Sequence, residues 1–147
     1  MGGIGQPSNG STIIPCLRYR DAQAAIDWLQ RAFGFHAQAV YADGDTVFHA
    51  QLTFGTGMIM LGSADKESEW SQHAAMPDEV GGRQTQNACV IVTDADAHYA
   101  RAKAAGARIV IDIADQDYGG RGYACADPEG YLWWFGSYDP WRADHGQ

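Results

Sequence analysis

The stretch DPEGYLWWF, residues 127–135, joins a turn to the beginning of a strand. Asp-Pro-Glu-Gly supplies the residue types of a tight turn, and the aromatic residues after it favour a strand. Neighbouring side chains on a strand point to opposite faces, so Trp133 and Trp134 must separate. We predict that Trp133 packs under a helix together with Phe135, whereas Trp134 faces the other side. The alternative is that both tryptophans are core residues.

Two helical segments further back in the chain follow one plan. DAQAAIDWLQRAFG begins with the N-cap residue Asp21 and ends at Gly34, and DADAHYARAKAAG begins with Asp94 and ends at Gly106. Each segment follows one strand-like run and precedes three others that are separated by turn residues. The two N-cap residues lie about 73 positions apart, which indicates that the chain contains two copies of one structural unit. We therefore predict an α+β fold of two βαβββ modules.

The composition of the intervening stretches sets the expected boundaries. Polar residues without a sustained period separate the two modules, and a Gly- and Ser-rich stretch precedes the first. We predict a flexible leader at 1–11, a first module at 12–62, a connection at 63–85, and a second module with the C-terminal tail at 86–147. We expect residues 12–141 to form one structural domain.

The net charge of −8 argues against nucleic acid and anionic membrane surfaces as partners, because both call for a basic surface. No apolar run approaches the roughly 18 residues of a transmembrane helix, and the first residues lack signal-peptide features. We expect a cytoplasmic protein. The three cysteines, Cys16, Cys89 and Cys125, lie in apolar strand-like runs without metal-motif spacing. We predict reduced, buried thiols.

This layout resembles the vicinal oxygen chelate superfamily, which includes glyoxalase I, bleomycin resistance proteins and extradiol dioxygenases. The marker is DPEGYLWWF, and LRYRDAQAAIDWLQRAFGF is similar to the first strand and helix of the family. The resemblance implies that each module is a curled four-stranded mixed sheet with an outer helix, and that the sheets enclose a cavity. It also implies a homodimer, because such cavities are often completed by a partner chain.

Metal-dependent members of that superfamily carry His or Glu on the first and last strand of each module. The matching positions here hold Ile14, Met60, Asn87 and Trp134. Ile and Trp offer no usable lone pair, Met suits copper, and Asn alone cannot hold a divalent ion. We therefore expect no metal ligand at these positions and no cofactor. Trp134 then takes a cavity-facing place.

Strand alternation extends the predicted site. We expect a buried apolar face that consists of Phe48, Ala50, Leu52 and Phe54, and an opposite face of His49, Gln51 and Thr53. Ile59 and Leu61 should be buried, so Met58 and Met60 should face the cavity. Arg18 on the first strand could hold a carboxylate, although a structural ion pair is the alternative. The Gly-rich stretch 115–123 reads as a rim loop. The predicted ligand-binding residues are Arg18, His49, Gln51, Met58, Met60, Asn87, Tyr118, Arg121, Tyr123 and Trp134.

No nucleophile–base pair is evident, and His49 is the best catalytic candidate. We expect a glyoxalase/bleomycin-resistance-like protein that binds a small, flat, partly apolar molecule in a metal-free cavity, for sequestration or resistance. The alternative is a glyoxalase- or dioxygenase-type enzyme, a lyase or oxidoreductase, with a displaced metal site or metal-free acid–base chemistry.

Overall fold

Each half of the chain contains one strand, one helix and three further strands, in the predicted order. The computed structural model describes residues 9–64 and 67–142. Its contacts divide the chain into two units, Met1–Ala74 and Ala75–Gln147. The boundary falls inside the predicted connection 63–85. The predicted leader 1–11 lies mostly outside the described residues, as do residues 143–147 of the predicted tail.

The first unit holds β1 (Cys16–Tyr19), α1 (Ala22–Phe33), β2 (His36–Asp43), β3 (Thr46–Phe54) and β4 (Gly57–Ser63). The second holds β5 (Ala88–Ile91), α2 (Ala95–Ala104), β6 (Arg108–Asp115), β7 (Arg121–Ala126) and β8 (Leu132–Gly136). The 3-10 turns η2 (Trp70–His73) and η3 (Pro77–Val80) lie in the connection. Within the described residues, no helix is long and apolar enough to cross a membrane.

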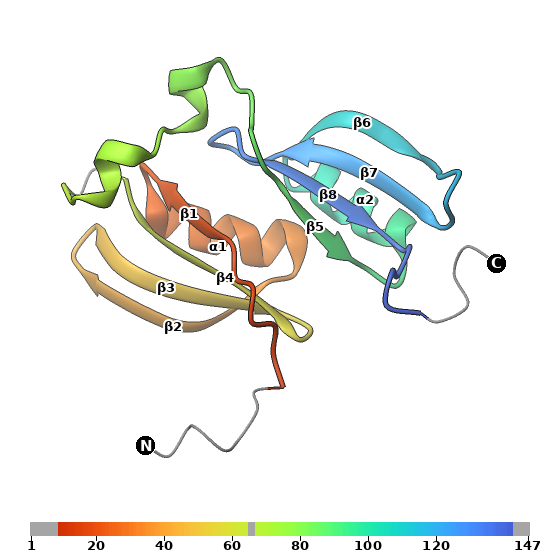
Figure 1. Cartoon of the computed structure of the whole chain (residues 1–147), viewed down its shortest axis with the longest axis horizontal. Coiled ribbons are helices and arrows are strands. Elements are labelled where there is room, and N and C mark those ends of the chain that lie inside the picture. The colour runs from red at the N-terminus through yellow and green to blue at the C-terminus, as the bar shows by residue number, and fades with distance from the viewer. Residues whose placement is uncertain (1–8, 65–66, 143–147) are drawn as a thin grey trace. The chain divides into compact units, whose positions relative to one another are not determined.

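Both sheets are mixed and share one strand order. In the first, the order is β1-β4-β3-β2, with β1 parallel to β4 and the other pairs antiparallel. The second repeats this as β5-β8-β7-β6. In each unit the helix runs across one face of its sheet (Figure 1). The predicted fold of two βαβββ modules is therefore confirmed.

The ends of both helices are the predicted ones. Asp21 accepts a hydrogen bond from the backbone N–H of Ala24 at 3.1 Å, and Asp94 accepts one from Ala97 at 3.0 Å. Each bond satisfies one of the amides that a helix N-terminus leaves without a partner. Gly34 follows α1 with a φ of 89°, in the left-handed region that glycine adopts without steric cost.

The helix-facing side of the first sheet forms a closely packed core. It buries alternate residues of β3 and β4 against the apolar face of α1. These sheet residues are Val47, Ala50, Leu52, Ile59 and Leu61. The prediction for Ile59 and Leu61 is thus confirmed.

Phe48 departs from the predicted alternation. Its side chain is 49% exposed, whereas its neighbour Val47 is fully buried. The reason is a β-bulge. Tyr41 pairs with His49 and Ala42 pairs with Val47, so Phe48 is an extra residue that reverses the facing of the strand before it. The prediction that Phe48 belongs to the buried face was wrong.

The two adjacent tryptophans separate as predicted. Trp133 is 1% exposed and Phe135 is fully buried. The indole N–H of Trp133 donates to Oδ2 of Asp127 at 3.1 Å, and the other oxygen of this buried carboxylate accepts from the backbone N–H groups of Glu129 and Tyr131. The turn at the beginning of the opening motif therefore ties down the tryptophan at its end.

Two of the three cysteines are not buried. Cys16 and Cys89 are exposed, whereas Cys125 is fully buried. Both exposed thiols lie on edge strands, where Cys16 pairs with Met60 and Cys89 with Trp134, away from the helix-facing core. The prediction of three buried thiols was wrong for this reason. Burial, and next the charge of Asp127, raises the pKa of the Cys125 thiol to about 12, so this thiol stays protonated at neutral pH.

Candidate functional site

A hollow of about 220 Å³ lies within the first unit. It opens on the face of the sheet that α1 does not cover, and η2 contributes to its wall. The lining residues are Cys16, Leu17, Arg18, Phe48, His49, Met60, Leu61, Gly62, Ser63, Ser68 and Trp70. They include one arginine, one histidine and no carboxylate, although the chain carries 18 acidic residues. The hollow therefore combines an apolar wall with a basic edge.

Gly62 belongs to the lining of the hollow, at a place where two strands approach closely. Gly62 pairs with Arg18 across β1 and β4. A Cβ atom at this position would lie 3.1 Å from the backbone oxygen of Phe48 and 3.3 Å from that of Val47. These distances are tighter than ordinary van der Waals contact, so the bulged part of β3 approaches β4 where β4 has glycine.

Aromatic rings supply much of the wall. The bulge turns Phe48 away from the core and into the lining. Trp70 comes from η2 and is 69% exposed. Met60 adds a flexible, polarizable side chain of the kind that packs well against aromatic rings. This set of side chains suits the faces of a flat apolar group.

A relay of two glutamines holds His49. Nε2 of His49 lies 2.9 Å from Oε1 of Gln51, and Nε2 of Gln51 donates to Oε1 of Gln38 at 2.7 Å. The ring of Tyr41 stacks beside the imidazole, with the ring centroids 6.1 Å apart. Gln38 is itself the extra residue of a second bulge, between Ala37 and Ala39. Both bulges of β2 and β3 therefore place a side chain toward His49 or the hollow.

Arg18 on β1 pairs with Gly62 on β4 and is partly buried. Its Nη2 donates to the backbone oxygen of Ala64 at 2.7 Å. This bond directs the guanidinium toward the end of β4, and Arg18 remains part of the lining. Met58 lies on the same sheet face but outside the lining, where it pairs with Thr53.

In the second unit, Trp134 covers the helix-free face of the sheet. A Cβ atom on Gly122 would lie 2.5 Å from Cζ2 of Trp134, and one on Gly136 would lie 2.9 Å from its Nε1. Gly122 and Gly136 are paired in the β7–β8 register. The indole thus occupies space that only this pair of glycines leaves open.

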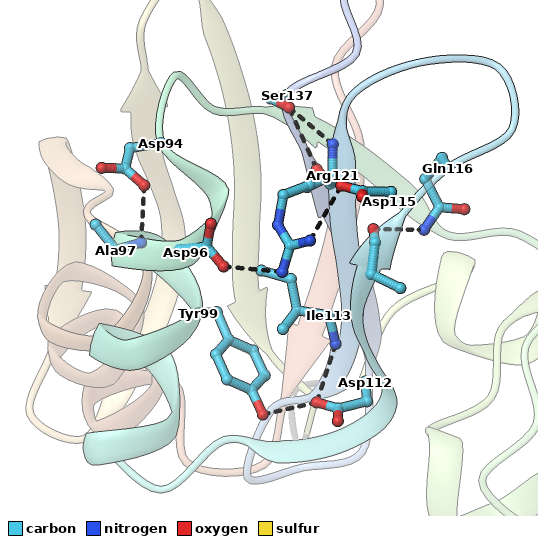
Figure 2. A network of polar contacts seen from close by, with 11 residues as sticks. Asp94, Asp96, Ala97, Tyr99, Asp112, Ile113, Asp115, Gln116, Arg121 and Ser137 are labelled. Carbon is cyan, nitrogen blue, oxygen red and sulfur yellow. Dashed lines mark hydrogen bonds and ion pairs between the residues drawn. The ribbon is translucent and has the colours of Figure 1, made fainter.

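The other predicted residues of the second unit have separate surroundings. Arg121 lies between Asp115 and Asp96 (Figure 2), and its Nη1 and Nη2 atoms lie 3.0 Å and 3.1 Å from a carboxylate oxygen of each. These two hydrogen bonds raise the pKa of the guanidinium, and the bond to Asp115 is the larger cause. Tyr118 is exposed and meets Tyr138 edge to face. Asn87 is exposed just before β5 and donates to the backbone oxygen of the next residue.

Tyr123 lies on the helix-facing side of the second sheet, not on the side of Trp134. It is fully buried, and its hydroxyl lies 2.6 Å from Nδ1 of His98 on α2. Burial raises the pKa of this phenol. Tyr123 pairs with the buried Phe135, and its neighbour Ala124 pairs with Trp134. Because neighbouring side chains on a strand point to opposite faces, this pairing places Tyr123 on the face opposite Trp134.

The four positions that hold metal ligands in relatives do not offer a suitable donor set here. Ile14 and Met60 belong to the first unit, and Asn87 and Trp134 to the second. Only the amide oxygen of Asn87 is a ligand that a hard divalent cation accepts readily. Across 9–64 and 67–142, no group of three or more His, Cys, Asp or Glu residues is placed to hold a metal ion.

Several residues of this site were not predicted from the sequence, among them Phe48, Gln38, Gly62 and Trp70. Phe48 was assigned to the core, and Gln38, Gly62 and Trp70 were assigned no role. Only Trp70 carried a signal, because a tryptophan in a polar connection is unusual and aromatic side chains are common in ligand sites.

Comparison with known proteins places residues 12–135 in the range of a family model described as Glyoxalase/Bleomycin resistance protein/Dioxygenase superfamily. An uncharacterized protein of Mycobacterium bovis is 32% identical over 125 residues, which cover 84% of this chain and 81% of the relative. Among solved structures, TioX from Micromonospora sp. ML1 has 36% identity and a TM-score of 0.69, covering 86% of this chain and 98% of TioX. The fosfomycin resistance protein FosX from Mesorhizobium loti has a TM-score of 0.60 at 14% identity, over 88% of this chain and 93% of FosX. The last match is a likeness of fold alone.

Proposed function

The chain belongs to the glyoxalase/bleomycin resistance protein/dioxygenase superfamily, and on that premise we propose that it binds a small, flat, partly apolar molecule without a metal. The hollow over Gly62 is the observation that carries the proposal. Binding of this kind requires shape and stacking surfaces, whereas catalysis also requires placed acid–base groups. The sequestration or resistance role that we propose requires only binding.

The size and the lining of the hollow define the ligand class. Pockets for drug-sized ligands are about 300–1,000 Å³, so a hollow of about 220 Å³ suits one or two fused rings. Phe48, Trp70 and Met60 offer contacts for the ring faces, and His49 and Arg18 offer polar contacts for its rim.

Trp134 supports a second stacking surface in the other unit. The indole lies over a glycine pair on the side of the sheet that α2 does not cover. Trp134 is only partly buried, which leaves part of the ring for a flat ligand. We keep it in the proposed ligand-binding set.

The test uses 2-naphthol, a flat two-ring probe with a single polar group, and titration calorimetry. A ligand of this size should bind with a Kd on the order of 0.1–1 mM. Trp70→Ala should weaken binding about tenfold, because it removes stacking and buried area. Trp141→Ala is the matched control, since Trp141 is 88% exposed and does not line the hollow. Equal affinity of both variants would contradict the proposed site.

A second candidate function is metal-free acid–base catalysis by His49. The relay that holds the ring in the hollow favours it, because a general base needs a fixed orientation. We would follow loss of the hemithioacetal of methylglyoxal and glutathione with metal-free protein. Turnover that His49→Phe abolishes would support this candidate, and the same rate with and without protein would remove it.

A further inference from the structure

We propose that the hollow selects flat ligands that present an O–H or N–H donor, because the glutamine relay leaves Nδ1 of His49 as a hydrogen-bond acceptor. This inference rests on the proposed function and deepens it. The earlier proposal specified a flat, partly apolar molecule, and this one specifies the polar group at its rim. It also assigns Gln38 and Gln51 as positioning residues.

The first step is the orientation of the Gln51 amide. The nitrogen atom Nε2 of Gln51 lies 2.7 Å from Oε1 of Gln38. The oxygen of Gln38 that faces Gln51 accepts but cannot donate, and the nitrogen of Gln51 donates to it. The oxygen of Gln51 therefore faces His49.

The second step is the tautomer of His49. Its Nε2 lies 2.9 Å from Oε1 of Gln51, and that oxygen can only accept. Nε2 must then carry the hydrogen. In a neutral imidazole one nitrogen donates and the other accepts, so Nδ1 has the free lone pair. No described residue makes a hydrogen bond to Nδ1.

The third step is the rigidity of this arrangement. Tyr41 stacks beside the ring of His49, with an angle of 26° between the two ring planes, and pairs with His49 across β2 and β3. The bulge at Gln38 turns the first member of the relay toward Gln51. A flip of the ring would keep the ring plane beside Tyr41 but would break the hydrogen bond to Gln51. The acceptor is therefore held ready before a ligand arrives.

The fourth step is the surroundings of His49. Near His49 the lining contains the apolar or aromatic side chains of Phe48, Met60 and Trp70. The other polar side chains of the lining, Arg18, Ser63 and Ser68, each make a hydrogen bond within the protein. In such surroundings a donor or an acceptor gives up its hydrogen bonds to water, and this costs free energy unless a partner in the site replaces them. Complementarity at Nδ1 should therefore decide between ligands of equal shape.

The binding experiment compares 2-naphthol with 2-methoxynaphthalene, which has the same rings but no donor. At about pH 8, where imidazoles are ordinarily neutral, the unchanged protein should prefer 2-naphthol about 3- to 10-fold, as expected for one hydrogen bond. His49→Phe keeps an aromatic ring beside Tyr41 and should reduce that preference to about one.

The ¹⁵N chemical shifts of the His49 ring provide a readout that does not depend on ligand. The spectrum should show Nε2 protonated and Nδ1 unprotonated, and comparison with His49→Phe assigns the signals. Gln51→Ala should release the ring and mix the two tautomers. A purely structural role of Gln51 would leave the tautomer unchanged.

The outcomes separate the two proposals. If neither probe binds, both the proposed function and the selectivity that rests on it are wrong. If both probes bind with equal affinity, or if Nδ1 carries the hydrogen in the unchanged protein, binding stands and the donor selectivity is overturned.

Discussion

Replacement of either neighbouring tryptophan tests how the closing strand divides its faces. Trp133 is 1% exposed, and its indole N–H donates to Asp127, which is itself 5% exposed. Trp134 is partly buried and lies over glycines on the opposite side of the sheet. Trp133→Ala and Trp134→Ala remove the same atoms from positions that are adjacent in sequence.

The expected magnitudes differ because the surroundings differ. Truncation of a buried tryptophan lowers the free energy of unfolding by about 3–5 kcal/mol. The hydrogen bond to Asp127 places Trp133→Ala at the upper end, because a buried carboxylate loses one of its donors. Trp134→Ala leaves no enclosed cavity and should lower the free energy of unfolding by about 1–2 kcal/mol. Whole domains have only about 5–15 kcal/mol, so Trp133→Phe should accompany Trp133→Ala in case the latter does not fold.

The assay is guanidinium chloride unfolding followed by far-ultraviolet circular dichroism, because tryptophan fluorescence changes with each substitution. We expect Trp133→Phe to be less stable than Trp134→Phe, since only the first breaks a buried hydrogen bond. Equal losses of stability for the two alanine variants would refute the assignment of the two faces. So would a larger loss for Trp134→Ala.

Further predictions concern ligand, acid, metal and assembly. Trp134→Ala should weaken binding of 2-naphthol at the second stacking surface about tenfold through lost stacking and burial, and calorimetry in which Trp134→Ala changes no binding event would remove Trp134 from the proposed ligand-binding residues. Chiefly the hydrogen bond from Tyr99 lowers the pKa of Asp112 from its ordinary 3.8, so Tyr99→Phe should raise this pKa in carbon-13 NMR titrations. Because the folded pKa is depressed, the stability that this pair contributes is present above the ordinary value and is lost as the pH falls through the folded pKa; a Tyr99→Phe deficit that persists at the lowest pH would contradict this. Protein purified without a tag should contain no stoichiometric divalent metal by mass spectrometry, and one ion per chain would count against the prediction. We expect a dimer by light scattering at micromolar concentration, and a monomer would show the prediction to be wrong.

The fold could be predicted because its signals are local and repeated. Asp21 and Asp94 cap their helices through side chains that act on the next turn. The alternation around Trp133 and Trp134 also needs only neighbouring residues. Such signals do not depend on how distant parts of the chain meet.

The details of the site could not be predicted because they depend on strand pairing. The bulges at Gln38 and Phe48 carry no glycine or proline that would mark them, and they appear only in the register between β2 and β3. Because Phe48 is one extra residue, the β3 residues before it point to the face opposite the one that regular alternation predicts. The relay from Gln38 to His49 likewise requires that register, because strand alternation alone does not place the two residues together.

The bulge at Phe48 also has a consequence for how relatives of this chain diverge. A deletion of one residue there would restore regular pairing between β2 and β3 and remove an aromatic side chain from the wall of the hollow. A single substitution changes one side chain, whereas this deletion would turn every side chain at the beginning of β3 to the other face of the sheet. We therefore expect homologues that lack this extra residue to have a hollow without the aromatic side chain of position 48, and alignments that treat a gap of one residue in β3 as noise would conceal this difference.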